Sequence, residues 1–173
     1  MIPDLNRTKT VIPRSFDDFY RNDYRSVVGL AFVLTGDWSA AEDLAQDAFL
    51  KAHKAWATIA GFDSPGAWVR KVMVNASRSA YRRRQTEVRA LRLVGAASRS
   101  SDELRIPETS SEVWRAVRRL PRRQGEAVAL TYYGGCSRQE VAEILGCSPF
   151  TVKTHLQRGK KALASQLGAE DAI

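Results

Sequence analysis

Apolar residues recur at steps of three or four along most of this chain, which is the period of an α-helix with one buried face. The first run covers residues 16–34 and is followed by turn-forming residues at 35–37. A second helix is expected from a capping box, in which Ser39 and Glu42 satisfy each other's backbone amides, to about residue 58. Strand signals are nearly absent, so the pattern predicts an all-α fold.

A third helix is expected to begin at Pro65, with Ser64 as its cap and Trp68 on its buried face. Another face of this helix is polar and basic, and it carries at helical spacing Lys71, Asn75, Arg78 and Arg82. Residues 93–108 are small and polar and are interpreted as a flexible linker.

Two further helices are expected beyond the linker. The first begins with a Thr109–Glu112 capping box and turns Val113 inward, and the second begins at Pro121 and ends at residues 134–135. Each helical unit is small, so its independent stability should be marginal.

The C-terminal pattern predicts a helix-turn-helix. Ser137 and Glu140 form a capping box, Gly146 ends that helix, and Ser148 caps a final helix to about residue 167. An ordinary helical hairpin is the alternative. In a helix-turn-helix the second helix enters the major groove of DNA, N-terminal end first. With Val152, Leu156 and Leu163 inward, the residues expected to face DNA are Ser148, Thr151, Lys153, Thr154, Gln157, Arg158 and Lys161. The chain is thus divided into an N-terminal extension, a helical-bundle domain, a flexible linker, a helix-turn-helix domain and a tail, spanning residues 1–15, 16–92, 93–108, 109–168 and 169–173.

Charge is distributed unevenly along the chain, whose formal net charge is +8. Residues 16–69 hold eight acidic and four basic side chains, whereas residues 70–99 hold nine basic side chains and one acidic. This switch favours one surface for a protein partner and another for a polyanion, with a solvated basic face as the alternative. The basic segment uses arginine more than lysine, which favours bidentate contacts with phosphates or bases.

Composition excludes several classes of protein. The longest apolar run, residues 27–34, is far shorter than the roughly 20 residues of a membrane span, and residues 1–7 do not resemble a signal peptide. Two cysteines and two histidines are too few for a metal cluster, so no metal or cofactor is expected. A DNA-processing enzyme is disfavoured, since no βαβ pattern, phosphate-binding glycine loop or paired nucleophile and base is found. We expect a cytoplasmic protein without enzyme activity.

Four segments of the chain resemble the sigma-70 family of bacterial RNA polymerase sigma factors. Residues 41–49 and 68–76 are similar to its second conserved region, and residues 130–142 with 151–153 are similar to its fourth. With only these two domains and a linker, the chain resembles the extracytoplasmic-function group. Cys136, Phe150 and His155 depart from the usual pattern of the fourth region.

The resemblance implies roles for the residues. The clamp helices of the polymerase largest subunit would bind Asp43, Gln46, Asp47 and Leu50, and the flap region would bind the C-terminal domain. Minus-ten promoter DNA and its melted non-template strand would contact Phe62, Asp63, Lys71, Asn75, Arg78 and Arg82. Duplex DNA of the minus-thirty-five element would contact the seven residues of the final helix and its cap. A solvated acidic face, and Phe62 as a core residue, are the alternatives.

The function that the resemblance implies is promoter-specific transcription initiation together with core polymerase, regulated by an anti-sigma factor. The alternative is a stand-alone helix-turn-helix regulator, which would leave the acidic face from Asp43 to Leu50 unexplained. Two promoter elements two helical turns apart span roughly 70 Å, so two tethered heads are expected.

Overall fold

The computed structural model describes residues 15–93 and 112–168, and every regular element in these two stretches is a helix. In chain order they are α1 (Phe16–Thr35), α2 (Trp38–Lys54), α3 (Trp56–Ile59), α4 (Pro65–Leu93), α5 (Glu112–Arg119), α6 (Arg122–Val128), the π-helix η1 (Ala129–Tyr133), α7 (Arg138–Leu145) and α8 (Pro149–Leu167). The prediction of an all-α fold is confirmed. Residues 1–14, 94–111 and 169–173 lie outside the described residues, and with them most of the predicted extension and linker, the tail and the Thr109 cap.

The turn between α1 and α2 is set by Gly36 and Asp37. Gly36 has φ 75°, the left-handed conformation that glycine adopts without a steric penalty, and its N–H donates back to the last turn of α1 at 2.7 Å. The Asp37 carboxylate accepts a backbone N–H of α2 at 3.0 Å. The predicted Ser39–Glu42 capping box is therefore wrong, because Asp37 caps the helix two residues earlier and Ser39 already lies within its first turn.

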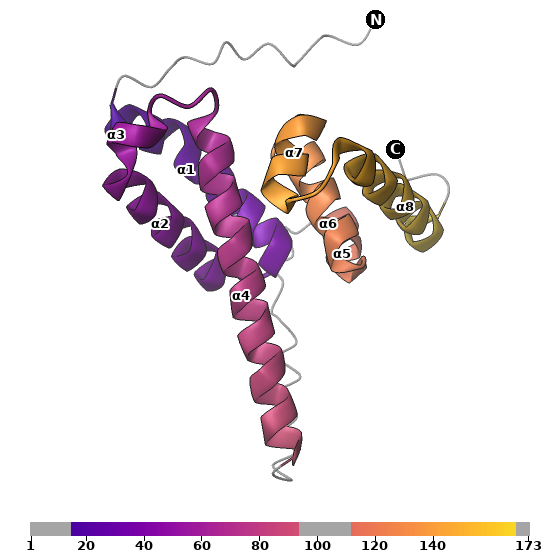
Figure 1. Ribbon diagram of the computed structural model, residues 1–173. Coiled ribbons are helices and arrows are strands. Elements are labelled where there is room, and N and C mark those ends of the chain that lie inside the picture. Colours follow the sequence, from indigo (N-terminus) through magenta and orange to yellow (C-terminus); the bar gives the residue numbers. More distant parts are fainter. Residues whose placement is uncertain (1–14, 94–111, 169–173) are drawn as a thin grey trace, which may run out of the picture.

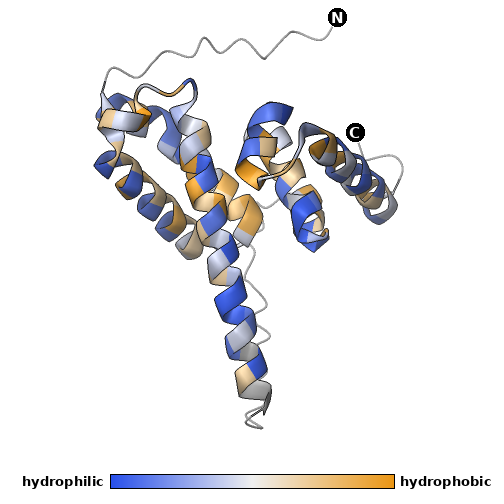
Figure 2. Ribbon diagram, viewed as in Figure 1, coloured by the Kyte–Doolittle hydropathy of each residue, from blue (hydrophilic) through white to orange (hydrophobic). Residues whose placement is uncertain are grey.

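The second predicted helix is interrupted at Ala55, whose φ of −104° and ψ of 12° separate α2 from the short α3. Ser64 then caps α4 as predicted, since its hydroxyl accepts the Ala67 N–H at 3.2 Å. The N-terminal half of α4 packs on α1 and α2, whereas its C-terminal part extends beyond the bundle (Figure 1). This extension is largely hydrophilic (Figure 2).

Helices α1–α4 form the N-terminal unit, around a core that joins large aromatic residues to small ones. Four alanines of α2 are almost fully buried and let α1 and α4 approach closely: Ala41, Ala45, Ala48 and Ala52. Phe19, Phe49 and Met73 fill the space between the helices, each 2% exposed or less. Trp68 is half-buried and packs against this core, as predicted.

Helices α5–α8 form the C-terminal unit, and α7, Gly146 and α8 have the predicted succession of helix, turn and helix. Both hydrogen bonds of the Ser137–Glu140 capping box are present, and Gly146 has φ 66°. Helix α8 buries Val152 and Leu163. Val113 was expected to face inward but is 39% exposed, and in this first turn of α5 it is Trp114 that packs against the apolar core instead.

The two units pack against each other, with α7 along α4 (Figure 1). In addition, η1 and α5 contact α1. Buried residues from both units form one continuous apolar cluster. Tyr133 of η1 lies so close to Gly29 of α1 that a Cβ at position 29 would be 1.8 Å from its hydroxyl oxygen. Arg118 of α5 donates to the Val33 carbonyl of α1 at 3.4 Å. The tethered heads expected from the sequence are thus docked on one another here, and the domain boundaries stay a prediction.

Candidate nucleic-acid and protein interfaces

Helix α8 presents a polar and basic face to solvent. The Ser148 hydroxyl accepts the Thr151 N–H at 3.1 Å and lies 2.9 Å from the Thr151 hydroxyl, so the N-terminal turn is capped on the exposed side. Thr151 and Thr154 are half-buried, and the other residues expected to contact DNA are exposed: Ser148, Lys153, Gln157, Arg158 and Lys161. The structure therefore brings all seven to one end and one side of the helix-turn-helix.

Two further residues of this region were not assigned by sequence reasoning. Phe150, noted there only as unusual, is 76% exposed. Lys160 lies with its ammonium 5.1 Å from the centre of the Tyr132 ring, which is a cation–π contact. The i, i+4 spacing between Phe150 and Thr154 could have placed Phe150 on the same face of the helix as Thr154. No feature of the sequence indicated the contact between Lys160 and Tyr132.

The face of α2 opposite its buried alanines holds the four residues expected to bind polymerase. All are exposed: Asp43, Gln46, Asp47 and Leu50. Leu50 is 54% exposed, although Phe49 beside it is 2% exposed, so an apolar side chain lies among polar ones on the solvent side. This arrangement is suited to a protein surface with complementary basic and apolar groups.

The predicted basic stripe on α4 is not uniform in the structure. Lys71, Asn75 and Arg82 are exposed, but the Arg78 side chain is only 16% exposed. Its Nε donates to one carboxylate oxygen of Glu126 at 2.9 Å, and its Nη2 donates to the other at 2.6 Å. Arg78 thus joins α4 to α6 in a bidentate ion pair instead of facing solvent with the rest of the stripe.

Glu126 is the central acceptor of this contact between the units. It is 3% exposed, it also accepts from Arg122 Nε at 2.9 Å, and Arg123 lies 4.0 Å away. Burial alone would raise the pKa of Glu126, but hydrogen bonds from Arg78 and Arg122 outweigh it and hold the pKa below its ordinary value. Sequence reasoning missed Glu126, although its i, i+4 spacing from Arg122 was a local signal.

A second polar contact links the N-terminus of α7 to the start of α4. The Glu140 carboxylate accepts the Ser137 N–H at 2.8 Å. Burial alone would raise the pKa of Glu140, but hydrogen bonds from Ser137 and from the Ser64 hydroxyl have the larger combined effect and hold the pKa below its ordinary value. The carboxylate is therefore charged at neutral pH.

The loop before α4 exposes an aromatic ring. Phe62 is 44% exposed and Asp63 beside it is exposed, so the alternative of Phe62 as a core residue is not supported. Its backbone N–H donates to the Ile59 carbonyl at 3.0 Å.

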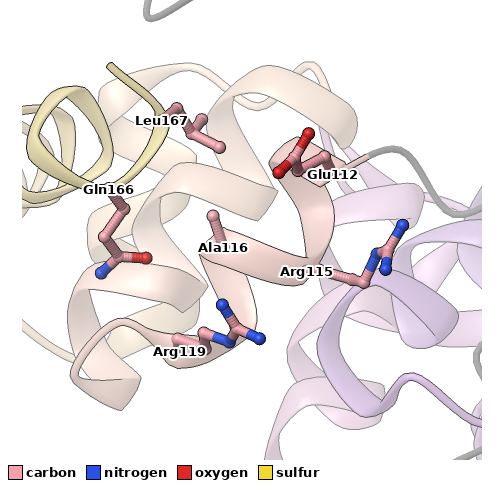
Figure 3. A pocket seen from close by; sticks show the side chains of 6 residues that line it. All are labelled: Glu112, Arg115, Ala116, Arg119, Gln166 and Leu167. Atoms are coloured by element: carbon pink, nitrogen blue, oxygen red, sulfur yellow. The ribbon is translucent and has the colours of Figure 1, made fainter.

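Other chemistry is sparse in the described residues. They contain no group of His, Cys, Asp and Glu side chains that could hold a metal, and none of their helices is long and apolar enough to cross a membrane. Cys136 is buried, which raises the pKa of its thiol, and Cys147 is half-buried. A pocket between α5 and the end of α8 is lined by Glu112, Arg115, Ala116, Arg119, Gln166 and Leu167 (Figure 3). This lining pairs no nucleophile with a base.

The sequence matches two known families, Sigma-70 region 2 over residues 19–87 and Sigma-70, region 4 over residues 110–163. It is 30% identical over 154 residues to the ECF RNA polymerase sigma factor SigM of Mycobacterium tuberculosis, covering 89% of this chain and 78% of that protein. It is 32% identical over 168 residues to the ECF RNA polymerase sigma factor EcfG of Rhodopseudomonas palustris, covering 89% and 90%.

Two solved structures have a similar fold. The sigma factor RpoE from Bartonella quintana, in complex with the anti-sigma factor NepR, matches with a TM-score of 0.73 and 24% identity, over 90% of this chain and 98% of that one. CnrH, in complex with the cytosolic domain of CnrY, matches with a TM-score of 0.64 and 26% identity, over 90% and 89%.

Proposed function

The chain belongs to the extracytoplasmic-function (ECF) group of the sigma-70 family of RNA polymerase sigma factors, and from this premise we propose how its surfaces divide the work of initiation. It acts in the cytoplasm as a dissociable subunit of RNA polymerase and catalyses no reaction of its own. It reads the minus-thirty-five element with α8, and it reads and opens the minus-ten element with α4 and the loop before it.

The observation that carries the proposal is the two-sidedness of α8. Val152, Gly159 and Leu163 hold one side of the helix in the C-terminal unit, which leaves the opposite side, with Gln157 and Arg158, free to enter a major groove. These side chains have the donors to read adenine and guanine edges, while Lys153 and Lys161 neutralise phosphates.

Contact with the minus-ten element combines charge and stacking. Exposed Lys71 and Arg82 attract the phosphates of the duplex, and the exposed ring of Phe62 stacks on an unstacked base of the non-template strand. Such stacking is worth about 1–3 kcal/mol per base, which offsets part of the cost of opening the duplex.

Core polymerase is bound mainly through α2. We assign Asp43, Gln46, Asp47 and Leu50 to the clamp helices of the largest subunit, because this face combines negative charge with an exposed leucine. The C-terminal unit meets the flap region.

Both units must separate on the promoter. The two elements lie roughly 70 Å apart, which two docked helical units of this size do not span. Separation breaks the Arg78–Glu126 ion pair, and Arg78 then rejoins the α4 stripe.

Run-off transcription with the host's core polymerase tests the proposal. Wild-type protein should direct initiation from a subset of host promoters, and Asp47→Lys should weaken its binding to core about tenfold, through like-charge repulsion at the interface. Asp17→Lys is the matched control, since Asp17 is an exposed acid on α1 outside the proposed surface. Tight binding of promoter duplex by the protein alone, with no transcript when core is added, would instead indicate a stand-alone regulator.

An anti-sigma partner completes the proposal. RpoE and CnrH were both solved with proteins bound to them, the first with an anti-sigma factor. We expect this chain to co-purify from unstressed host cells with a protein that covers α2 and α4. Recovery of the chain alone, from cells in which its promoters are silent, would contradict this.

A further inference from the structure

Phe150 is the most exposed large apolar side chain among the residues that the structure describes. It is 76% exposed, whereas the other exposed aromatic and aliphatic side chains of comparable size lie between 37% and 54%. A single exposed apolar residue needs no explanation by itself. The position of Phe150 on α8 is the reason to assign it a role.

Phe150 is the second residue of α8 and lies in the middle of its outward face. At about 100° per residue, Thr154, Gln157 and Lys161 follow it at i+4, i+7 and i+11 and lie within about 40° of it around the helix axis. The buried residues Val152, Gly159 and Leu163 lie on the opposite side.

The backbone around Phe150 is fixed, so the ring has a defined origin. Ser148 caps the turn through the Thr151 N–H, and the Thr154 hydroxyl donates to the Phe150 carbonyl at 3.2 Å. The first residues of the second helix are the ones that reach base edges in a helix-turn-helix complex. Phe150 therefore lies on the part of α8 that, in such a complex, is closest to the base edges.

We propose that Phe150 determines promoter specificity by packing on the C5-methyl group of a thymine in the minus-thirty-five element. A phenyl ring offers no hydrogen bond to a base edge or a phosphate, and the thymine methyl is the apolar group that the major groove presents. The inference rests on the proposed function, and it adds a preference for thymine to what Gln157 and Arg158 read by hydrogen bonding.

Replacing thymine by deoxyuridine tests the contact, because deoxyuridine keeps the base pair and lacks only the methyl group. Holoenzyme is assembled from host core with wild-type protein, Phe150→Ala or Phe150→Leu. Each is bound to a promoter found by run-off transcription, with the thymines of its minus-thirty-five element replaced one at a time on either strand. For the wild type, one or two positions should lose about three- to fivefold in affinity.

The Phe150→Ala holoenzyme should bind the natural promoter about as weakly as wild type binds the sensitive deoxyuridine template, and deoxyuridine should weaken it no further. Phe150→Leu should retain part of the methyl effect. Tyr20→Ala, which removes an exposed ring on α1, should leave the wild-type pattern unchanged.

Equal deoxyuridine sensitivity of wild type and Phe150→Ala would overturn the inference, as would a minus-thirty-five element without thymine. Weaker core binding by Phe150→Ala would also overturn it, in favour of a contact with polymerase. In each of these cases wild type still initiates transcription, so the proposed function stands. A wild-type holoenzyme that initiates nowhere would overturn both.

Discussion

Replacing Glu126 by glutamine keeps the size of this side chain but removes the charge that joins the two units. Glu126 is 3% exposed, and the Arg78 side chain that it binds is 16% exposed, so the variant leaves a largely buried guanidinium without its counterion. Removing one partner of a buried ion pair typically costs 3–5 kcal/mol. Arg78 keeps some access to water and its 3.3 Å contact with Asn75, so we expect a loss of about 2–3 kcal/mol. Arg122 and Arg123 are more exposed and add little.

Urea unfolding followed by circular dichroism measures this loss. The Glu126→Gln midpoint should fall at neutral pH, whereas Glu143→Gln, a change at an exposed carboxylate of α7, should stay within about 0.5 kcal/mol of wild type. Because folding lowers the pKa of Glu126, its contribution is complete above the unfolded value of 4.5 and is lost as pH falls through the folded value. The difference between the two proteins should therefore shrink below about pH 4.5. Equal midpoints at pH 7 would refute the reasoning.

Three more predictions concern packing, capping and DNA binding. Gly125→Ala should lower the free energy of unfolding by about 1–3 kcal/mol, because its Cβ would lie 2.9 Å from the Val117 carbonyl oxygen. Gly61→Ala is the control and should not lower it, because its Cβ would lie 3.7 Å from the Thr58 carbonyl oxygen. Equal thermal unfolding of the two variants would contradict this prediction. Ser137→Ala should cost about 1 kcal/mol by removing the cap of α7, measured by the same unfolding curves, and no change would mean that Glu140 alone holds this turn. Lys161→Gln should reduce the slope of log K against log salt for holoenzyme binding to promoter duplex by about one, and an unchanged slope would place Lys161 away from phosphates.

Local rules predicted much of the fold. The Ser64 and Ser137 caps and the Gly146 turn depend on neighbouring residues alone, and the structure contains all three. The Ser39 cap failed because Asp37 is an equally good cap two residues earlier, and spacing cannot decide between them. Helical period also placed Asp43 and Asp47 on an exposed face.

Contacts between distant residues account for what the sequence did not reveal. Periodicity assigned Arg78 to the basic stripe, but only the fold brings Glu126, 48 residues further along the chain, within hydrogen-bonding distance. The packing of Tyr133 on Gly29 is of the same kind, because the sequence around one residue does not indicate its contact with the other. Periodicity states which side of a helix faces inward and does not state which partner covers it.

The apolar cluster shared by the two units also affects what the protein binds when it is not on DNA. In the separated form proposed above, the apolar surface that is buried between the docked units is exposed to water. Renewed docking of the two units and binding of another protein therefore compete for this apolar surface, and the faster of the two determines which complex forms. The rate at which transcription from its promoters stops should depend on the rates of these two competing associations as much as on the affinity for promoters.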